Sequence, residues 1–310
     1  MRGRSKISVI GAGNVGATCA HRLLEMQLGD VVIIDVVEGI PQGKGLDMLE
    51  MTPVLGSSVK VMGENEYEFT HDSDVVIITA GLARKPGMSR DDLLAANAKI
   101  VAGVTTQAVK FSPNAVIIVV TNPMDVMAYV AAQVSGFPKE RVLGMGGVLD
   151  SARFRAFISA ELDVSVESTH AFVLGGHGDA MVPLVRYSTA GGVPISELMP
   201  EYRVKELVER TKNGGAEIVS LLKTGSAFYA PGAAAAEMAG AIIRDTKKVL
   251  PCSVWLDGMY GQSGVYSGVP VKLGKDGAEV IIPLKLTPEE QEAFDKSCEG
   301  VKQGMAATGY

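Results

Sequence analysis

Residues 6–24 read "KISVIGAGNVGATCAHRLL", a glycine-rich turn set between two regular segments. Gly11, Gly13 and Gly16 form a G-x-G-x-x-G pattern after a short apolar run and at the start of a helix-compatible stretch. In such a turn the first glycine permits a tight bend, the second lets backbone approach a pyrophosphate, and the third lets the helix pack close to the strand. The helix N-terminus then faces the anion. The stretch therefore predicts a dinucleotide-binding turn.

The position of Asp35 gives this turn its context. Glycine-rich turns are common, but here a second Val/Ile run, 31–35, ends in Asp35 nineteen residues after Gly16. An acidic side chain at that place accepts hydrogen bonds from both ribose hydroxyls and repels a 2′-phosphate, which favours NAD over NADP. The alternative is a turn that serves packing only, with an aspartate that caps a helix.

Short runs rich in valine and isoleucine alternate with helix-compatible stretches through the first 145 residues. The predicted strands are 6–10, 31–35, 58–62, 74–79, 115–120 and 141–144, and the helical stretches include 14–28 and 91–110. Near-continuous hydrophobicity is typical of strands covered on both faces, and alternation with helices implies right-handed βαβ units. The predicted fold class is α/β, with a Rossmann-type doubly wound parallel sheet that forms an NAD-binding domain over residues 1–145.

The rhythm changes from residue 146 onward. Longer helices are predicted at 148–161, 203–222, 232–247 and 287–303, and strand-like pieces lie near 168–174, 252–256, 265–273 and 278–282. The turn residues GKDG predict an antiparallel hairpin within 263–282. This pattern predicts a mixed α+β substrate domain over residues 146–310, which shares a broad interface with the first.

Charge and cysteine content argue against several classes of function. A net charge of −6 and a pI near 5.4 do not fit a phosphate-backbone binder, so nucleic acid is not expected as a partner. Cys19, Cys252 and Cys298 have no disulfide or zinc spacing, which predicts reduced, mostly buried thiols in a cytoplasmic protein without a metal site. No apolar run approaches the roughly 20 residues of a membrane helix, and the basic start MRGRSK precedes no signal-sequence core, so no membrane partner is expected.

Among the four histidines, His177 is the candidate for chemistry. It lies in LGGHGDAMVP, where flanking glycines leave the imidazole accessible at the mouth of a strand, and its ordinary pKa suits proton transfer. The alternative is a turn residue without a catalytic role. His21 and His71 are expected to be structural or solvated, and His170 to be a half-buried residue of a strand.

A catalytic histidine needs a carboxylate that fixes its tautomer and stabilises the imidazolium. Asp150 and Arg153, in GVLDSARFR, are three residues apart at a predicted helix start, which puts both on one face. If that face lines a cleft, Asp150 can hold His177 while Arg153 presents a planar fork to a substrate carboxylate. The alternative is a surface ion pair worth less than ~1 kcal/mol.

Polar and small residues end two neighbouring apolar strands. Asn122 follows the run 115–120, at the sheet edge where open α/β folds bind ligands, and its bond to Pro123 is a candidate cis peptide. Thr79-Ala80-Gly81 ends the other strand, and its small side chains would let a dinucleotide lie against it.

The segment 82–93, LARKPGMSRDDL, concentrates cations in an acidic chain. Arg84, Lys85 and Arg90 surround a Pro-Gly pair. The segment is either a solvated connection or a flexible arm that closes over something negative.

Taken together, these motifs resemble the lactate/malate dehydrogenase family, and the malate enzymes built on the lactate-dehydrogenase-like scaffold in particular. The resemblance covers nearly the whole chain and rests on GAGNVG (11–16), Asp35, TAG (79–81), TNP (121–123), LDSARFR (149–155) and GGHGD (175–179).

The resemblance implies roles for the candidate residues. His177 is implied as the proton acceptor and donor, with Asp150 as its partner. Arg153 is implied to bind the C1 carboxylate of the substrate, and Asn122 to contact the substrate near the nicotinamide. Arg90 matches the loop arginine that polarises the carbonyl being reduced.

Arg84 falls at the specificity position of the family, where lactate dehydrogenases typically have Gln and malate dehydrogenases have Arg. The second carboxylate of malate or oxaloacetate would pair with Arg84, whereas pyruvate would leave the guanidinium enclosed without a partner. Ala227, where many lactate enzymes have a bulkier Thr, would leave room for the longer dicarboxylate.

The resemblance thus implies an NAD-dependent malate dehydrogenase of the tricarboxylic acid cycle, assembled as a homotetramer or homodimer. The alternatives are a lactate or other 2-hydroxyacid dehydrogenase and, more remotely, an NAD-binding protein without catalysis. The implied NAD contacts are Gly11, Gly13, Asn14, Val15, Gly16, Asp35, Thr79, Ala80, Gly81, Asn97, Val120 and Asn122.

Overall fold

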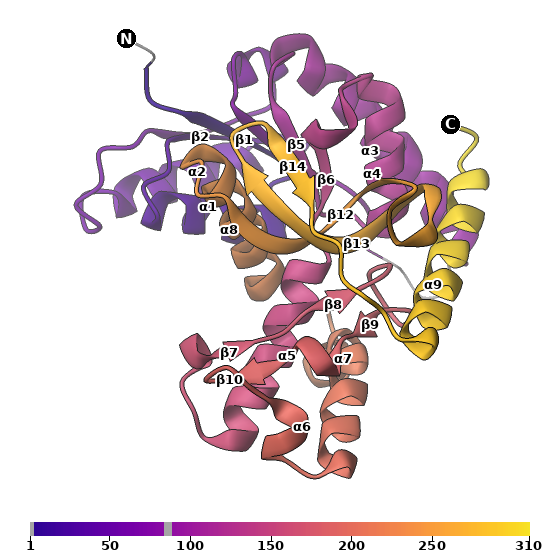
Figure 1. Cartoon of the computed structure of the whole chain (residues 1–310). Coiled ribbons are helices and arrows are strands. Elements are labelled where there is room, and N and C mark those ends of the chain that lie inside the picture. The colour runs from indigo at the N-terminus through magenta and orange to yellow at the C-terminus, as the bar shows by residue number, and fades with distance from the viewer. Residues whose placement is uncertain (1–2, 84–88) are drawn as a thin grey trace.

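The computed structural model describes residues 3–83 and 89–310, and within these ranges nine strands form one sheet (Figure 1). Six of them are parallel, in the order β3-β2-β1-β4-β5-β6. Their bounds are β1 Lys6–Ile10, β2 Asp30–Ile34, β3 Val61–Glu64, β4 Val75–Ile78, β5 Val116–Val119 and β6 Val142–Gly144. From β1 the chain adds β2 and β3 on one side, and it then crosses to add β4, β5 and β6 on the other side. Folds of this kind bind dinucleotides at the place where the strand order reverses, between β1 and β4. The predicted α/β class and doubly wound sheet are confirmed.

The helices between these strands are α1 Asn14–Glu25, α2 Ile40–Met51, α3 Arg90–Phe111 and α4 Met124–Ser135. Strands β4 and β5 are buried along their whole length, as their unbroken Val/Ile runs require. Short 3₁₀ segments complete the connections: η1 Tyr67–Thr70, η2 Lys139–Arg141, η3 Val166–Ser168, η4 Val185–Tyr187 and η5 Met259–Gly261.

The second half adds three antiparallel strands to the same sheet. These are β12 Lys248–Asp257, β13 Ser263–Gly274 and β14 Gly277–Ile281, and Ser253 of β12 pairs with Gly144 of β6. The predicted hairpin within 263–282 is confirmed, with Lys275 and Asp276 in its turn. The division of the chain at residue 145 stays a prediction, because β6 and β12 lie on either side of it.

The remaining elements form the lower part of Figure 1 and the helices beside the sheet. The helices are α5 Gly147–Leu162, α6 Ile195–Leu198, α7 Glu201–Leu222, α8 Tyr229–Ile243 and α9 Pro288–Ala306. The short strands are β7 Thr169–His170, β8 Val173–Leu174, β9 Val182–Pro183, β10 Thr189–Ala190 and β11 Val193–Pro194. A separate apolar cluster, with Phe154, Ile158 and Leu207 among its members, holds α5 to α7.

Two predicted strands differ from the structure. The strand expected at 58–62 begins at Val61, where it pairs with Val31. The strand expected at 168–174 is two short strands, because β7 pairs with β10 while β8 pairs with β9. The three cysteines are free and buried, as predicted. Across the part of the chain that the structure describes, no helix is long and apolar enough to cross a membrane.

Candidate functional site

The three glycines of the turn between β1 and α1 have different steric surroundings. A Cβ on Gly11, whose φ is +111°, would lie 2.7 Å from the backbone nitrogen of Ala80. A Cβ on Gly16 would lie 1.8 Å from the carbonyl oxygen of Gly11, so the close approach of helix and strand requires glycine there. A Cβ on Gly13 would meet no protein atom within 4 Å. The space beside Gly13 is therefore left open, as a pyrophosphate cradle requires.

Asp35 closes the other side of this turn. Its Oδ2 accepts a hydrogen bond from the backbone N–H of Ala12 at 2.6 Å, and its Oδ1 accepts one from Val37 at 3.0 Å. Each carboxylate oxygen retains a further lone pair for a ribose hydroxyl. The Lys44 ammonium, from α2, donates to the carbonyl oxygen of Ala12 at 2.5 Å. Lys44 was not identified from sequence because it belongs to no motif.

The ends of β4 and β5 are tied together by Thr121 and Asn97. The Thr121 hydroxyl donates to the carbonyl oxygen of Ala80 at 2.7 Å. The fully buried Asn97, from α3, accepts the N–H of Leu82 at 2.7 Å and donates to the carbonyl oxygen of Asn122 at 2.7 Å. The side chain of Asn97 therefore supports the backbone on which a cofactor would rest.

The other predicted cofactor contacts lie around the same edge of the sheet. Thr79 donates its hydroxyl to the carbonyl oxygen of Gly11 at 3.1 Å. Asn14 and Gly81 are exposed, and Asn122 is exposed ahead of a cis bond to Pro123, which confirms that prediction. The remaining members are half-buried or buried: Val15, Ala80 and Val120.

Helix α5 carries the second part of the site. His177, in the loop after β8, has its ring Nδ1 2.8 Å from Oδ2 of Asp150, in the first turn of α5. Arg153 donates from Nη1 to the other carboxylate oxygen of Asp150 at 3.2 Å. Asp150 is 1% exposed, so its carboxylate lies in a low-dielectric surrounding between the guanidinium of Arg153 and the imidazole of His177. The three candidates, His177, Asp150 and Arg153, are thus joined through the carboxylate of Asp150.

The surroundings of His177 favour its protonated form. Burial lowers the pKa of the imidazole, but the charge and hydrogen bond of Asp150 and the charge of Asp125 outweigh burial and the nearby Arg153, so the pKa is raised. Since Nδ1 faces a carboxylate, it carries a proton, and Nε2 is the nitrogen left to exchange one. The arrangement can therefore take a proton from a hydroxyl or return it to a carbonyl oxygen.

Arg153 keeps donor capacity beyond its bond to Asp150. Its Nε is buried and has no hydrogen-bond partner among the described residues. Gly214 of α7 lies against it, since a Cβ there would be 3.1 Å from Cδ of Arg153. A buried guanidinium with an unmatched donor is suited to an anionic ligand.

Asp125 was missed from sequence. It lies in the first turn of α4 and is 4% exposed, and its two oxygens accept hydrogen bonds from the N–H of His177 at 2.7 Å and the hydroxyl of Ser253 at 2.6 Å. Burial raises the pKa of its carboxyl, against the effect of both donors. The available signal was an acid three residues after Asn122, in TNPMD.

The other three histidines do not take part in this arrangement. His21 is half-buried on α1, His71 is exposed beside Asp72, and His170 is exposed on β7, so the expectation of a half-buried His170 was wrong. Arg84 and Lys85 lie outside the described residues. Arg90 begins α3, and its side chain also lies outside the description.

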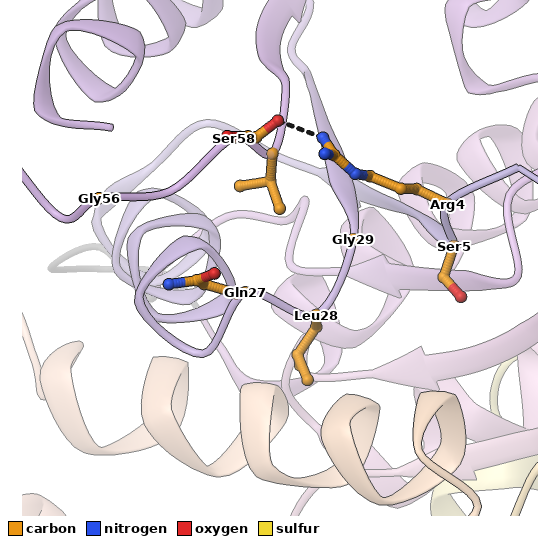
Figure 2. Close-up of a pocket in the computed structure, with 8 residues that line it drawn as sticks. Arg4, Ser5, Gln27, Leu28, Gly29, Gly56 and Ser58 are labelled. Atoms are coloured by element: carbon orange, nitrogen blue, oxygen red, sulfur yellow. Dashed lines mark hydrogen bonds between the residues drawn. The ribbon is translucent and has the colours of Figure 1, made fainter. Parts of the chain in front are cut away.

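The site coincides neither with a metal-binding cluster among the described residues nor with the surface cavity drawn in Figure 2. Within residues 3–83 and 89–310, no group of three or more His, Cys, Asp or Glu residues is arranged to hold a metal ion. Figure 2 shows a cavity of about 360 Å³ lined by Arg4, Gln27 and Ser58 among others, with Arg4 donating to the carbonyl oxygen of Ser58. None of the candidate residues above lines it.

Comparison with known proteins gives matches along the whole chain. Residues 5–144 match the model of the lactate/malate dehydrogenase NAD binding domain, and residues 147–308 match that of the lactate/malate dehydrogenase alpha/beta C-terminal domain. A malate dehydrogenase of Desulforudis audaxviator is 56% identical, over 96% of this chain and 97% of its own length.

Two solved structures illustrate the range of activities on this fold. The malate dehydrogenase of Salinibacter ruber superimposes with a TM-score of 0.94 at 52% identity, covering 97% of both chains. The lactate dehydrogenase of Cryptosporidium parvum, complexed with lactic acid and β-nicotinamide adenine dinucleotide, has a TM-score of 0.96 at 43% identity, covering 100% of this chain and 99% of that one.

Proposed function

The chain belongs to the lactate/malate dehydrogenase family, and on that premise we propose that it is an NAD-dependent malate dehydrogenase. It interconverts (S)-malate and oxaloacetate. The observation that carries the proposal is the contact of His177, Asp150 and Arg153, which unites a proton-exchanging group with a carboxylate-binding one. The relatives at 53–58% identity that are named malate dehydrogenase favour malate over lactate.

The residues of the first half fit NAD. The open space beside Gly13 accommodates the pyrophosphate, and Asp35 is placed to accept the ribose hydroxyls and disfavour a 2′-phosphate. Ala80 and Val120 border the same edge of the sheet. When bound, the cofactor supplies the hydride acceptor at its nicotinamide ring.

The acid–base chemistry follows from the charges on α5 and its neighbours. Arg153 binds the C1 carboxylate of malate, which orients the C2 hydroxyl toward Nε2 of His177. Nε2 takes the hydroxyl proton as the C2 hydride leaves, and Asp150 stabilises the imidazolium that forms. In the reverse direction, protonated His177 donates to the carbonyl oxygen of oxaloacetate. Arg90 polarises that carbonyl, and Asn122 contacts the substrate.

Selection of the dicarboxylate is assigned to Arg84, on the segment 82–93. Its guanidinium pairs with the distal carboxylate of oxaloacetate, where charge-assisted hydrogen bonds contribute about 1.5–3 kcal/mol each. Pyruvate has a methyl group in that place, so the enclosed charge has no partner and pyruvate is rejected. The half-buried Ala227 leaves room for the longer substrate.

The test is the ratio of kcat/KM for oxaloacetate to kcat/KM for pyruvate, measured by NADH oxidation. We expect the wild type to prefer oxaloacetate, and Arg84→Gln to lower the ratio by about 100-fold or more. Lys85→Gln removes a neighbouring cation and serves as the matched control, with little change expected. A wild type that prefers pyruvate would establish the lactate alternative, and an unchanged ratio in Arg84→Gln would remove the specificity argument.

Assembly and location form the last part of the proposal. The chain forms a homodimer or homotetramer, and support comes from apolar side chains exposed on α2, namely Ile40, Leu46 and Leu49, and at the end of α7, namely Leu221 and Leu222. Three free, buried cysteines support a reducing, cytoplasmic location. The reaction fits a place in the tricarboxylic acid cycle.

A further inference from the structure

Two different carboxylates hold His177, one at its imidazole ring and one at its backbone N–H. The ring is held by Asp150 of α5 at 2.8 Å, and the peptide N–H is held by Asp125 of α4 at 2.7 Å. A catalytic histidine needs a carboxylate against its ring, which explains the contact with Asp150 but not the contact with Asp125.

Asp125 occupies a packed position. Its other oxygen accepts from the hydroxyl of Ser253, on β12, at 2.6 Å. A Cβ on Gly176 would lie 3.5 Å from Oδ2 of Asp125, and a Cβ on Gly146 would lie 3.0 Å from Cβ of His177. Gly146 therefore leaves room for the side chain of His177, whereas a Cβ on Gly176 would make only an ordinary contact with the carboxylate.

Groups from three neighbouring elements act on the carboxyl of Asp125. Its carboxyl is acted on by His177 from the loop after β8, by Asp150 from α5, and by the hydroxyl of Ser253 from β12. On α9, burial raises the pKa of the Cys298 thiol, and the charge of Asp125 raises it further in smaller part. When protonated, the imidazole of His177 adds a favourable charge to the hydrogen bonds that Asp125 accepts from Ser253 and from the N–H of His177.

We propose that Asp125 is a positioning residue for the acid–base reaction, which holds the main chain of His177 and favours the imidazolium through its negative charge. This inference rests on the proposed function. Because Asp125 lies three residues after Asn122, the same contact also fixes the acid–base loop relative to the end of β5. Asp125 thereby positions His177, in the second half of the chain, relative to the proposed cofactor-binding edge of the sheet in the first half.

Asp125→Asn tests the charge. The amide keeps the shape, can accept the N–H of His177 through Oδ1, and can donate to Ser253 through Nδ2, but it carries no charge. Loss of a nearby negative charge lowers the pKa of His177. Oxaloacetate reduction needs protonated His177, so kcat/KM falls as pH rises through that pKa. We expect this falling limb to move to lower pH by about half a unit or more in Asp125→Asn.

Ser297→Ala is the matched control, because the Ser297 hydroxyl accepts the N–H of Gly176 at 2.8 Å and anchors the same loop without charge. We expect it to leave the pH of the limb unmoved, whatever it does to kcat. A limb at the wild-type pH in Asp125→Asn, or an equal shift in Ser297→Ala, would overturn the proposal.

Ser253→Ala keeps the carboxylate and removes one of its donors, so it provides a second measurement if Asp125→Asn does not fold. Without that donor the ionised carboxylate is less favoured, and we expect a smaller shift of the limb in the same direction. An unmoved limb would contradict the proposal. A wild type inactive with both oxaloacetate and pyruvate would instead refute the proposed function, and the two failures are thus distinguishable.

Discussion

Gly214, the first of two consecutive glycines in α7, leaves room for the side chain of Arg153. A Cβ on Gly214 would lie 3.1 Å from Cδ of Arg153, whereas a Cβ on Gly215 would have only ordinary contact, 3.9 Å from Nη2. Glycine within a helix lowers stability by about 1 kcal/mol relative to alanine. The two glycines of NGGAE therefore lower the helix stability of α7, and the side chain of Arg153 explains why the first of them is glycine.

Substituting each glycine separates the two effects. We expect Gly215→Ala to raise stability by about 1 kcal/mol and to leave KM for oxaloacetate within about twofold. Gly214→Ala should displace Arg153 by a few tenths of an ångström and raise KM several-fold, since misplacement of about 1 Å costs on the order of 100-fold. Thermal melting and steady-state kinetics measure both. Equal KM values in the two variants would contradict this account of Gly214.

At the residue scale, the sequence was informative where a chemical pattern existed. Asp150 and Arg153 were found because a spacing of three puts them on one helical face, and His177 because glycines flank it. Asp125 and Ser253 lie far apart in sequence, and only pairing of β12 beside β6 brings the hydroxyl to the carboxylate. Their relation is tertiary, so no local pattern could indicate it.

At the scale of the element, the turn between β1 and α1 offers a sharper contrast. Gly16 is required by the carbonyl oxygen of Gly11, 1.8 Å from an added Cβ, whereas Gly13 has a φ of −65° and open space beside it. The third glycine therefore serves the fold, and the second serves the ligand.

We expect Gly16→Ala to destabilise the protein by about 3 kcal/mol or more, because backbone must move to relieve the overlap. Gly13→Ala should keep the free energy of unfolding within about 0.5 kcal/mol of the wild-type value. It should bind NADH roughly tenfold or more weakly, because its methyl group would occupy the space of the pyrophosphate. Thermal denaturation and NADH fluorescence titration measure the two effects. An unchanged NADH affinity in Gly13→Ala would show that the pyrophosphate lies elsewhere.

Strands that are buried along their whole length were predictable from sequence. Elements whose bounds depend on pairing with residues far away in sequence were not. Strands β4 and β5 are buried throughout, so their Val/Ile runs were unambiguous. Helix α2 was not singled out because its apolar side chains Leu46 and Leu49 are exposed, so it lacks the pattern of a helix that faces a core. The single strand predicted at 168–174 is two strands in the structure, because β7 pairs with β10 and β8 pairs with β9.

At the scale of the whole molecule, several large apolar side chains are exposed on α2 and in the turn after it. Ile40, Leu46 and Leu49 are 45%, 58% and 45% exposed, and Val54, in the turn after the helix, is 86% exposed. Exposed apolar surface of this kind can mark a protein–protein contact, so we assign these side chains to the contact between subunits proposed above.

We expect the wild type to sediment as a dimer or tetramer, and Leu46→Glu to shift it toward a smaller species, because a charge would be buried without a partner. Leu198→Glu on α6, where the side chain is 42% exposed, is the control and should leave the assembly intact. Sedimentation velocity at several concentrations measures the distribution. A monomeric wild type would exclude this use of α2.

The pairing of Ser253 with Gly144 also bears on how the chain is made. During synthesis β6 emerges well before β12, and at about 5–20 residues per second the interval lasts on the order of ten seconds. For that time the nascent sheet has an unsatisfied border, the kind that recruits strands from other molecules and starts aggregates. Ribosome-associated chaperones would therefore be needed most between the appearance of β6 and the arrival of β12.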